Sequence, residues 1–213
     1  MRYDLDQVDS SIAYKLLAAT IMPRPIAWVV TKGADGCVNA APYSFFNGMG
    51  ANPPTVAIGL LADPEKGFKD TAQNILDHGE FVVNLVPERL VEKMNVTAVN
   101  APTGTQELDL AGLETVPSVH ITPPRIAESP VAFECRSLSN VVTGPQQTVV
   151  IGRVLAVHID DDCLLDVEQA YIDTPKLDLV GRSYGSSYVR AQDTFDLDRP
   201  TWDNWDGTVP QKR

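Results

Sequence analysis

Residues 23–60 read PRPIAWVVTKGADGCVNAAPYSFFNGMGANPPTVAIGL, and this stretch decides the fold class. Residues 25–32 are rich in β-branched and aromatic side chains, which predicts a strand. Residues 33–36, Gly-Ala-Asp-Gly, predict a turn, so residues 37–41 return as the second strand of a hairpin. The apolar run at 55–61 has the length of another buried strand.

Outward from this stretch, more strands than helices are predicted. Helices are expected at 10–19, 69–78 and 88–97; the second has Asp70 as its N-cap and Gly79 as its stop. Strands are expected at 81–85, 131–138, 149–159 and 184–188. Within 131–138 the alternation places Glu134 and Arg136 on a face that contacts solvent.

Because the strands mostly follow one another, with helices inserted between some of them, a doubly wound parallel sheet is not expected. The pattern predicts a mainly β fold with inserted helices, closed as an antiparallel barrel. We place this unit at residues 1–190 and treat 191–213, an acidic segment with Trp202 and Trp205, as a separate tail. The long segment 100–118, rich in Pro, Gly and Thr, predicts a functional loop.

Composition excludes several classes of function. With 28 acidic and 17 basic side chains the formal charge is −11, which argues against nucleic-acid binding. The first eight residues are polar, unlike a signal peptide, and no apolar run reaches the roughly 18 to 20 residues of a membrane span. The widely spaced Cys37, Cys135 and Cys163 indicate reduced thiols, so we expect a cytoplasmic protein without membrane contact.

Several catalytic motifs are also excluded. The sequence contains neither G-x-x-x-x-G-K-[ST] nor G-x-G-x-x-G. Residues 181–185 match the G-x-S-x-G nucleophile elbow around Ser183, but His78, His120 and His158 all precede that serine, against the order of α/β-hydrolases. We therefore interpret 181–185 as a turn. The histidines and cysteines share no ligand spacing, so no metal site is expected.

Two short segments have the chemistry of a cofactor site. Residues 40–47 combine small side chains, a hydroxyl, aromatics and an amide, which suits contact with a flat ring. Lys69 and Thr71 stand where a helix begins, and the free N–H groups of a helix N-terminus favour phosphate. Arg24, held between two prolines, is a third group able to meet an anion. Taken alone, the first two features fit a structural role better, as core aromatics and as an ordinary helix cap beside a surface lysine, and Arg24 could equally pair with a surface carboxylate.

Taken in order, residues 23–60, KDTAQNI at 69–75 and GEFVVNLV at 79–86 resemble the flavin reductase-like, FMN-binding split-barrel family, to which flavoredoxin belongs. The resemblance continues more loosely through 128–135 and 151–154. It implies a split β-barrel, a homodimer and FMN near the subunit interface. It also implies these FMN-binding residues: Arg24, Pro25, Asn39, Ala41, Tyr43, Ser44, Phe45, Phe46, Asn47, Lys69 and Thr71.

The resemblance further implies an NAD(P)H-dependent flavin reductase in which a nicotinamide passes hydride to the flavin. Because the cofactor carries that chemistry, no catalytic side chain is named. The reduced flavin then serves a partner oxygenase or another redox protein. A flavoredoxin-type electron-transfer protein and an FMN-binding module without turnover remain alternatives. The choice between NADH and NADPH, the final acceptor and the role of the tail stay open.

Overall fold

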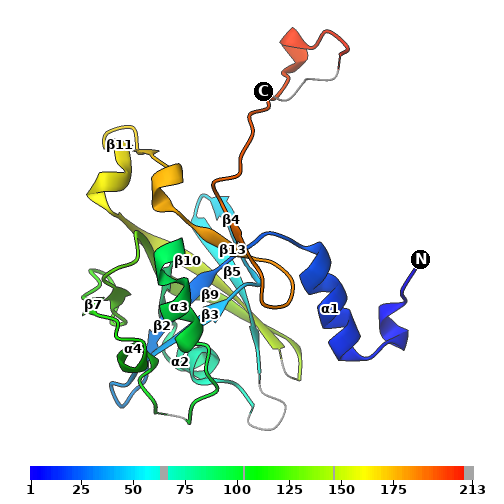
Figure 1. Cartoon of the computed structure of the whole chain (residues 1–213). Coiled ribbons are helices and arrows are strands. Elements are labelled where there is room, and N and C mark those ends of the chain that lie inside the picture. The colour runs from blue at the N-terminus through cyan, green and yellow to red at the C-terminus, as the bar shows by residue number, and fades with distance from the viewer. Residues whose placement is uncertain (63–66, 103, 146, 209–213) are drawn as a thin grey trace.

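The structure is a computed structural model that describes residues 1–62, 67–102, 104–145 and 147–208 (Figure 1). Its α-helices are α1 (Ser10–Thr20), α2 (Asp70–His78), α3 (Val91–Val96) and α4 (Glu107–Leu110). Short 3-10 turns are η1 (Leu5–Gln7), η2 (Glu88–Leu90), η3 (Asp161–Cys163), η4 (Pro175–Leu177) and η5 (Trp202–Asn204).

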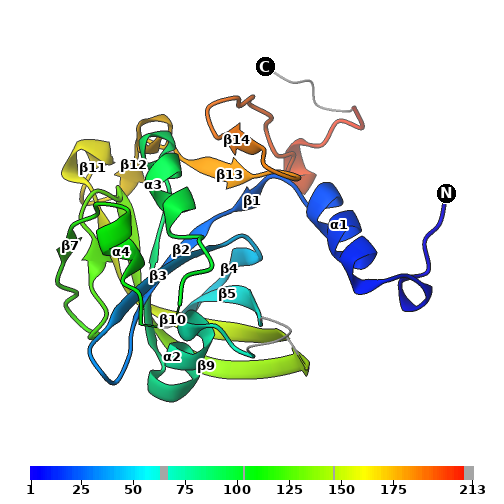
Figure 2. The same ribbon diagram turned by 60° about the horizontal axis from the view of Figure 1, so that its bottom comes forward.

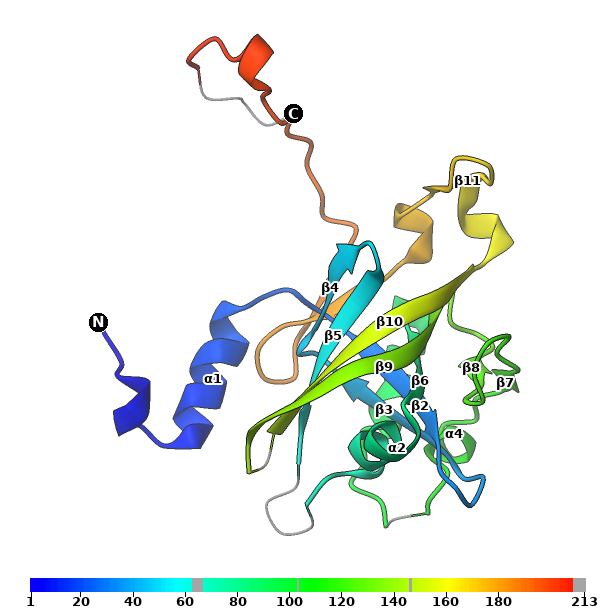
Figure 3. The same ribbon diagram turned by 180° about the vertical axis from the view of Figure 1, so that it is seen from behind.

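One seven-stranded antiparallel sheet forms the body, in the order β3-β2-β6-β9-β10-β5-β4. Its strands are β2 (Ala27–Lys32), β3 (Val38–Tyr43), β4 (Phe46–Ala51), β5 (Pro54–Leu61), β6 (Glu80–Asn84), β9 (Val131–Gly144) and β10 (Gln147–Ile159). The long β9–β10 hairpin crosses the molecule in Figure 3.

Three small sheets complete the strand arrangement. The first joins β1 (Arg24–Pro25), β13 (Val180–Arg182) and β14 (Tyr188–Arg190). The second pairs β7 (Thr115–Val116) with β8 (Arg125–Ile126), and the third pairs β11 (Leu164–Asp166) with β12 (Tyr171–Ile172).

The connection between β3 and β4 shows that the large sheet curls on itself. These strands are its two opposite edges, yet only Ser44 and Phe45 separate them in the chain. The Gly59 N–H of β5 donates to the Phe45 carbonyl at 2.7 Å, so the connection stays against the sheet. The predicted mainly β, antiparallel barrel-like fold with inserted helices is confirmed.

Strand β2 is apolar from Ala27 to Val30 because both of its faces are covered there. Trp28 and Val30 belong to one core cluster, with Leu90 and Met94 from the η2–α3 segment. Ala27 and Val29 belong to a second cluster on the other face, which also contains Ala72 and Ile75 of α2 and the Phe81 ring. Figure 2 shows α2 against the strands and α1 standing apart from the body.

Several element boundaries differ from the prediction. Asp9 rather than a serine caps α1, through its carboxylate and the Ser11 N–H at 2.8 Å. Lys69 is the N-cap of α2, so the prediction of Asp70 as the cap was wrong; Asp70 is the first helical residue, where its charge still favours the helix dipole. Gly79 ends α2 in the left-handed conformation, as predicted.

The later segments show further corrections. Of the predicted strand 184–188 only Tyr188 lies in a strand, because Gly185, at a φ of 62°, forms part of the turn between β13 and β14. The predicted helix 88–97 is divided into η2 and α3, and the segment 100–118 contains α4 and β7. In Figure 1 the chain after β14 leads away from the body.

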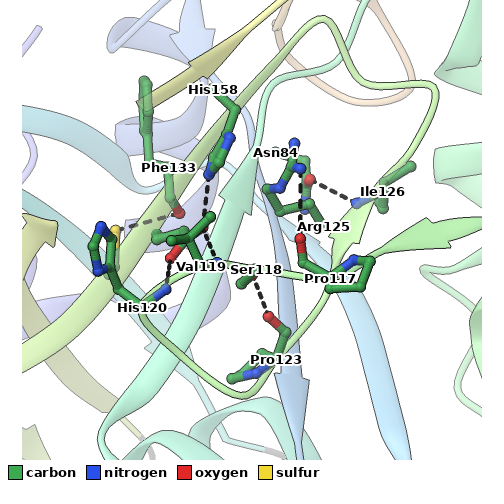
Figure 4. A network of polar contacts seen from close by, with 12 residues as sticks. Asn84, Pro117, Ser118, Val119, His120, Pro123, Arg125, Ile126, Phe133 and His158 are labelled. Carbon is green, nitrogen blue, oxygen red and sulfur yellow. Dashed lines mark hydrogen bonds and ion pairs between the residues drawn. The ribbon is translucent and has the colours of Figure 1, made fainter. Parts of the chain in front are cut away.

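The solvent-facing prediction for Glu134 was wrong. Glu134 is fully buried because the segment 117–126 folds over that side of β9. Its carboxylate accepts the N–H groups of Val119 and His120, each at 2.7 Å, and contacts His158 Nε2 at 2.6 Å (Figure 4). Burial alone would raise the pKa of Glu134, but these donors outweigh burial and hold the pKa below its usual value.

Candidate functional site

A cavity of about 400 Å³ lies between β3, the start of α2 and the segment after α3. That volume falls within the roughly 300 to 1,000 Å³ of small-molecule sites. The lining residues are Tyr14, Asn39, Ala41, Pro42, Tyr43, Ser44, Phe45, Gly59, Leu61, Gly67, Phe68, Lys69, Asp70, Thr71, Thr97, Ala98, Val99, Asn100, Ala101 and Glu107.

Strand β3 supplies the polar floor of the cavity. Asn39, Ala41 and Tyr43 alternate along the strand and therefore share one face. The Asn39 amide donates to the Thr71 hydroxyl at 2.6 Å, which ties β3 to α2. Burial raises the pKa of Tyr43 to about 12, against an opposing contribution from Thr71. The phenol therefore stays protonated at physiological pH and keeps an O–H donor.

The first turn of α2 provides the part of the wall suited to an anion. Lys69 precedes the helix, and the earliest backbone bond of the helix runs from the Gln73 N–H to the Lys69 carbonyl. The N–H groups of the preceding helical residues consequently have no carbonyl within the helix to bond. Together with the positive end of the helix dipole, these N–H groups favour a phosphate or carboxylate.

Residues 97–101 form the opposite wall, which sequence analysis missed. Thr97 fixes this wall to the core: its buried hydroxyl accepts the Trp28 indole N–H at 2.9 Å and donates to the Met94 carbonyl at 2.7 Å. No sequence motif marks this role. The only signal was the prediction that the segment from residue 100 onward is functional.

Glu107 is the second site residue that sequence analysis missed. It lies at the start of α4, is 7% exposed, and accepts the Ala40 N–H at 3.3 Å. Burial raises the pKa of Glu107; its own backbone N–H and that of Ala40 oppose the shift, and the charge of Asp70 adds to it. The hydrogen bonds that reach its carboxyl group thus do not offset the effect of burial.

Aromatic rings stand at another side of the cavity. Tyr14 of α1 meets the Phe45 ring edge-on, with centroids 6.0 Å apart and an interplanar angle of 76°. Gly59 permits this placement, since a Cβ at Gly59 would lie 3.1 Å from the Phe45 Cβ. Helix α1, which lies outside the sheet, therefore contributes to the cavity through the Tyr14 ring.

The structure brings seven of the predicted cofactor-binding residues to this cavity: Asn39, Ala41, Tyr43, Ser44, Phe45, Lys69 and Thr71. Four others lie outside its lining. Pro25 pairs with Gly181 in the small sheet, Phe46 packs against the second core cluster, and Asn47 accepts the Gly48 N–H with its own side chain.

The fourth predicted residue outside the cavity lining is Arg24, whose guanidinium forms hydrogen bonds with other groups of the chain. The buried side chain donates to the carbonyls of Ala18, Ile21 at 2.8 Å and Ser183 at 3.0 Å, and to the Ser44 hydroxyl at 3.3 Å. It joins α1, the β13–β14 turn and the β3–β4 connection. In this structure Arg24 therefore shapes the site through Ser44 rather than by lining it.

Within the described ranges, no three His, Cys, Asp or Glu side chains are grouped as a metal site would need. None of the helices described is both long and apolar enough to cross a membrane. Of the charged side chains that line the cavity in these ranges, Lys69 is basic and Asp70 and Glu107 are acidic. When all three are ionised, these side chains sum to one negative charge, and the basic one, Lys69, stands at the start of α2.

Comparison with known sequences gives a consistent result. Residues 19–174 match the family model described as flavin reductase like domain. An uncharacterized protein of Deinococcus radiodurans is 40% identical over 208 residues, which cover 95% of this chain and 91% of that one. The uncharacterized protein YwrF of Bacillus subtilis is 36% identical over 204 residues, 93% of this chain and 98% of that one.

Solved structures agree. Nitrilotriacetate monooxygenase component B from Bacillus cereus is 31% identical, with a TM-score of 0.87 over 92% of this chain and 98% of that one. The 2-nitrobenzoate 2-nitroreductase of Pseudomonas fluorescens is also 31% identical, with a TM-score of 0.85 over 95% and 98%. Flavoredoxin of Desulfovibrio vulgaris shares the fold, with a TM-score of 0.73 over 91% and 95% at 21% identity.

Proposed function

The chain belongs to the flavin reductase-like family, and from that premise we propose that it binds FMN in the cavity between β3 and α2 and accepts hydride from NADH or NADPH. One observation carries the proposal. The cavity joins the backbone of an edge strand and aromatic rings, which suit a flat ring system, to a helix N-terminus, which suits a phosphate.

The residues of the cavity divide into two groups that fit the two ends of FMN. Lys69, Thr71 and the first N–H groups of α2 would hold the phosphate. The segment from Ala41 to Phe45 would contact the ring, where Tyr43 keeps its hydroxyl proton. Bound FMN would supply the two-electron chemistry, while the protein orients it and limits contact with water.

The acceptor of the electrons belongs to one of two classes. One structural relative at 31% identity is a component of a monooxygenase, and another at the same identity is a nitroreductase. We propose that reduced flavin serves a partner oxygenase, with a small oxidised substrate such as a nitro compound as the second class. Supplying each acceptor to the reduced protein and recording reoxidation separates the two.

We also propose a homodimer in which the tail 191–213 reaches a second copy. Within the described part of the tail, Leu197 and Trp202 are exposed, and Trp202 is 89% accessible. Helix α1 likewise exposes Ile12 and Leu17. Such apolar groups are usually covered when a partner is present. Light scattering should give twice the chain mass, and a monomer would contradict this arrangement.

The direct test of the proposed function is anaerobic titration. The purified protein should bind FMN, and NADH or NADPH should bleach the flavin absorbance. Replacing both Lys69 and Thr71 with alanine should weaken FMN binding roughly 10- to 100-fold, since charged hydrogen bonds contribute about 1.5–3 kcal/mol.

The matched control replaces the exposed Thr174 and Lys176, which lie outside the cavity, with alanine. It should leave FMN affinity unchanged. Equal affinity in the Lys69/Thr71 variant would contradict the phosphate assignment alone. Absence of FMN binding by the unmodified protein would contradict the proposed function.

A further inference from the structure

The Glu107 carboxyl group is a buried acid in the wall of the cavity. The hydrogen bonds that hold it come from backbone N–H groups, its own and that of Ala40. Among the described residues no basic side chain forms an ion pair with it. An ionised carboxylate has two oxygens with room for about four donors, so this group can accept further hydrogen bonds.

Capping the edge of β3 explains only part of this arrangement. Ala40 lies on β3, an edge strand, and its N–H would otherwise need another acceptor. A serine, an asparagine or a water would satisfy one N–H without placing an acid in a largely buried site. The acid costs free energy there unless donors from a ligand reach it.

The position of Glu107 restricts the kind of donor. Along β3, Asn39 lies at the end bonded to Thr71, beside the start of α2, and Tyr43 lies at the other end, beside Phe45. Glu107 bonds the strand at Ala40, near the α2 end. A carboxylate repels a phosphate but accepts hydrogen bonds from neutral hydroxyls, and in FMN the hydroxylated ribityl chain joins the phosphate to the ring.

We propose that Glu107 is a ligand-binding residue that accepts hydrogen bonds from the ribityl hydroxyl groups of the flavin. The site therefore selects flavins that carry a ribityl chain over the bare ring. This inference rests on the proposed function and deepens it, since it assigns a specificity-determining residue to the same cavity. The exposed Glu114, which follows α4 and lies outside the cavity, provides the matched control.

The test compares riboflavin with lumiflavin, which has the same ring and a methyl group in place of the chain. Neither carries a phosphate, so repulsion between Glu107 and an anion does not enter. Glu107→Gln should weaken riboflavin binding about tenfold, as expected for a charge-assisted hydrogen bond. Lumiflavin binding should change less than about twofold, and Glu114→Gln should leave both affinities unchanged.

Equal weakening of both ligands, or no change in either, would overturn the assignment, because each outcome is that of a residue which only shapes the wall. The unmodified protein gives a measurement that requires no variant: riboflavin should bind at least about tenfold more tightly than lumiflavin. Equal affinities would overturn the inference while leaving FMN binding, and so the proposed function, intact. Failure to bind FMN at all would overturn both.

Discussion

Glu107 and Glu134 are both buried carboxyl groups that accept hydrogen bonds from backbone N–H groups, yet their pKa values move in opposite directions. Two loop N–H groups and His158 meet Glu134, and its pKa is lowered. Burial dominates at Glu107, and its pKa is raised. The comparison indicates that a fully compensated carboxylate serves the fold, whereas an under-compensated one beside a cavity has capacity left for a ligand.

The largest expected difference between the two acids is in stability. Glu134→Ala should lower the free energy of unfolding by about 4 kcal/mol, because it removes a buried carboxylate and leaves two part-buried N–H groups and His158 without their acceptor. Glu107→Ala should cost about 1 kcal/mol, since it removes one longer hydrogen bond to Ala40. Urea denaturation measures both losses in the free energy of unfolding. Equal losses would contradict the contrast between the two carboxyl groups.

The second-largest expected difference between Glu107 and Glu134 is in how each makes stability depend on pH. A lowered folded-state pKa means that Glu134 stabilises the fold above its unfolded value near 4.5, and that this contribution is lost as the pH falls through the folded pKa. Glu134→Gln should therefore flatten the loss of stability in acid. Glu107 has a raised pKa, so its contribution is present at low pH and is lost as the pH rises.

The measurement is the free energy of unfolding across the acid range for the unmodified protein, Glu134→Gln and Glu107→Gln. Glu107→Gln should remove a contribution to stability that is lost as the pH rises. It should leave in place the loss of stability that Glu134 causes in acid. Parallel curves for all three proteins would show that neither carboxyl group titrates differently in the folded and unfolded chains.

The smallest effect concerns the influence of Asp70 on Glu107. Asp70→Asn should lower the pKa of Glu107 only slightly, because burial is the main cause of the shift and the Asp70 charge the last. Following the Glu107 carboxyl carbon by NMR titration gives this value directly. A return of the pKa to its ordinary range would instead make the neighbouring charge, not burial, the origin of the difference.

Sequence reasoning succeeded where one local rule decided the structure. Residues 26–30 are apolar on both sides because β2 is buried on both faces there, and the residues around Tyr43 and Lys69 reach one cavity. Sequence reasoning failed to predict the burial of Glu134. Alternation along a strand indicates which side a residue faces, but it does not indicate which loop covers that side. The burial came from the distant segment 117–126.

The missed site residues have the same physical cause. Thr97 and Glu107 enter the cavity through the packing of α3 and α4, and neither lies in a motif. Arg24 shows the opposite case: its type suited an anion, but the carbonyls near the end of α1 and in the β13–β14 turn take its donors. Such long-range pairings depend on the assembled fold.

The outer edge of β3 offers few donors to another strand. Pro42 has no N–H to offer, and the N–H of Ala40 is already taken by Glu107. A neighbouring molecule that tried to extend the sheet there would find two donors missing, which is how natural proteins discourage fibril growth at open strands. By occupying the Ala40 N–H, Glu107 thus also helps to block extension of the sheet at this edge.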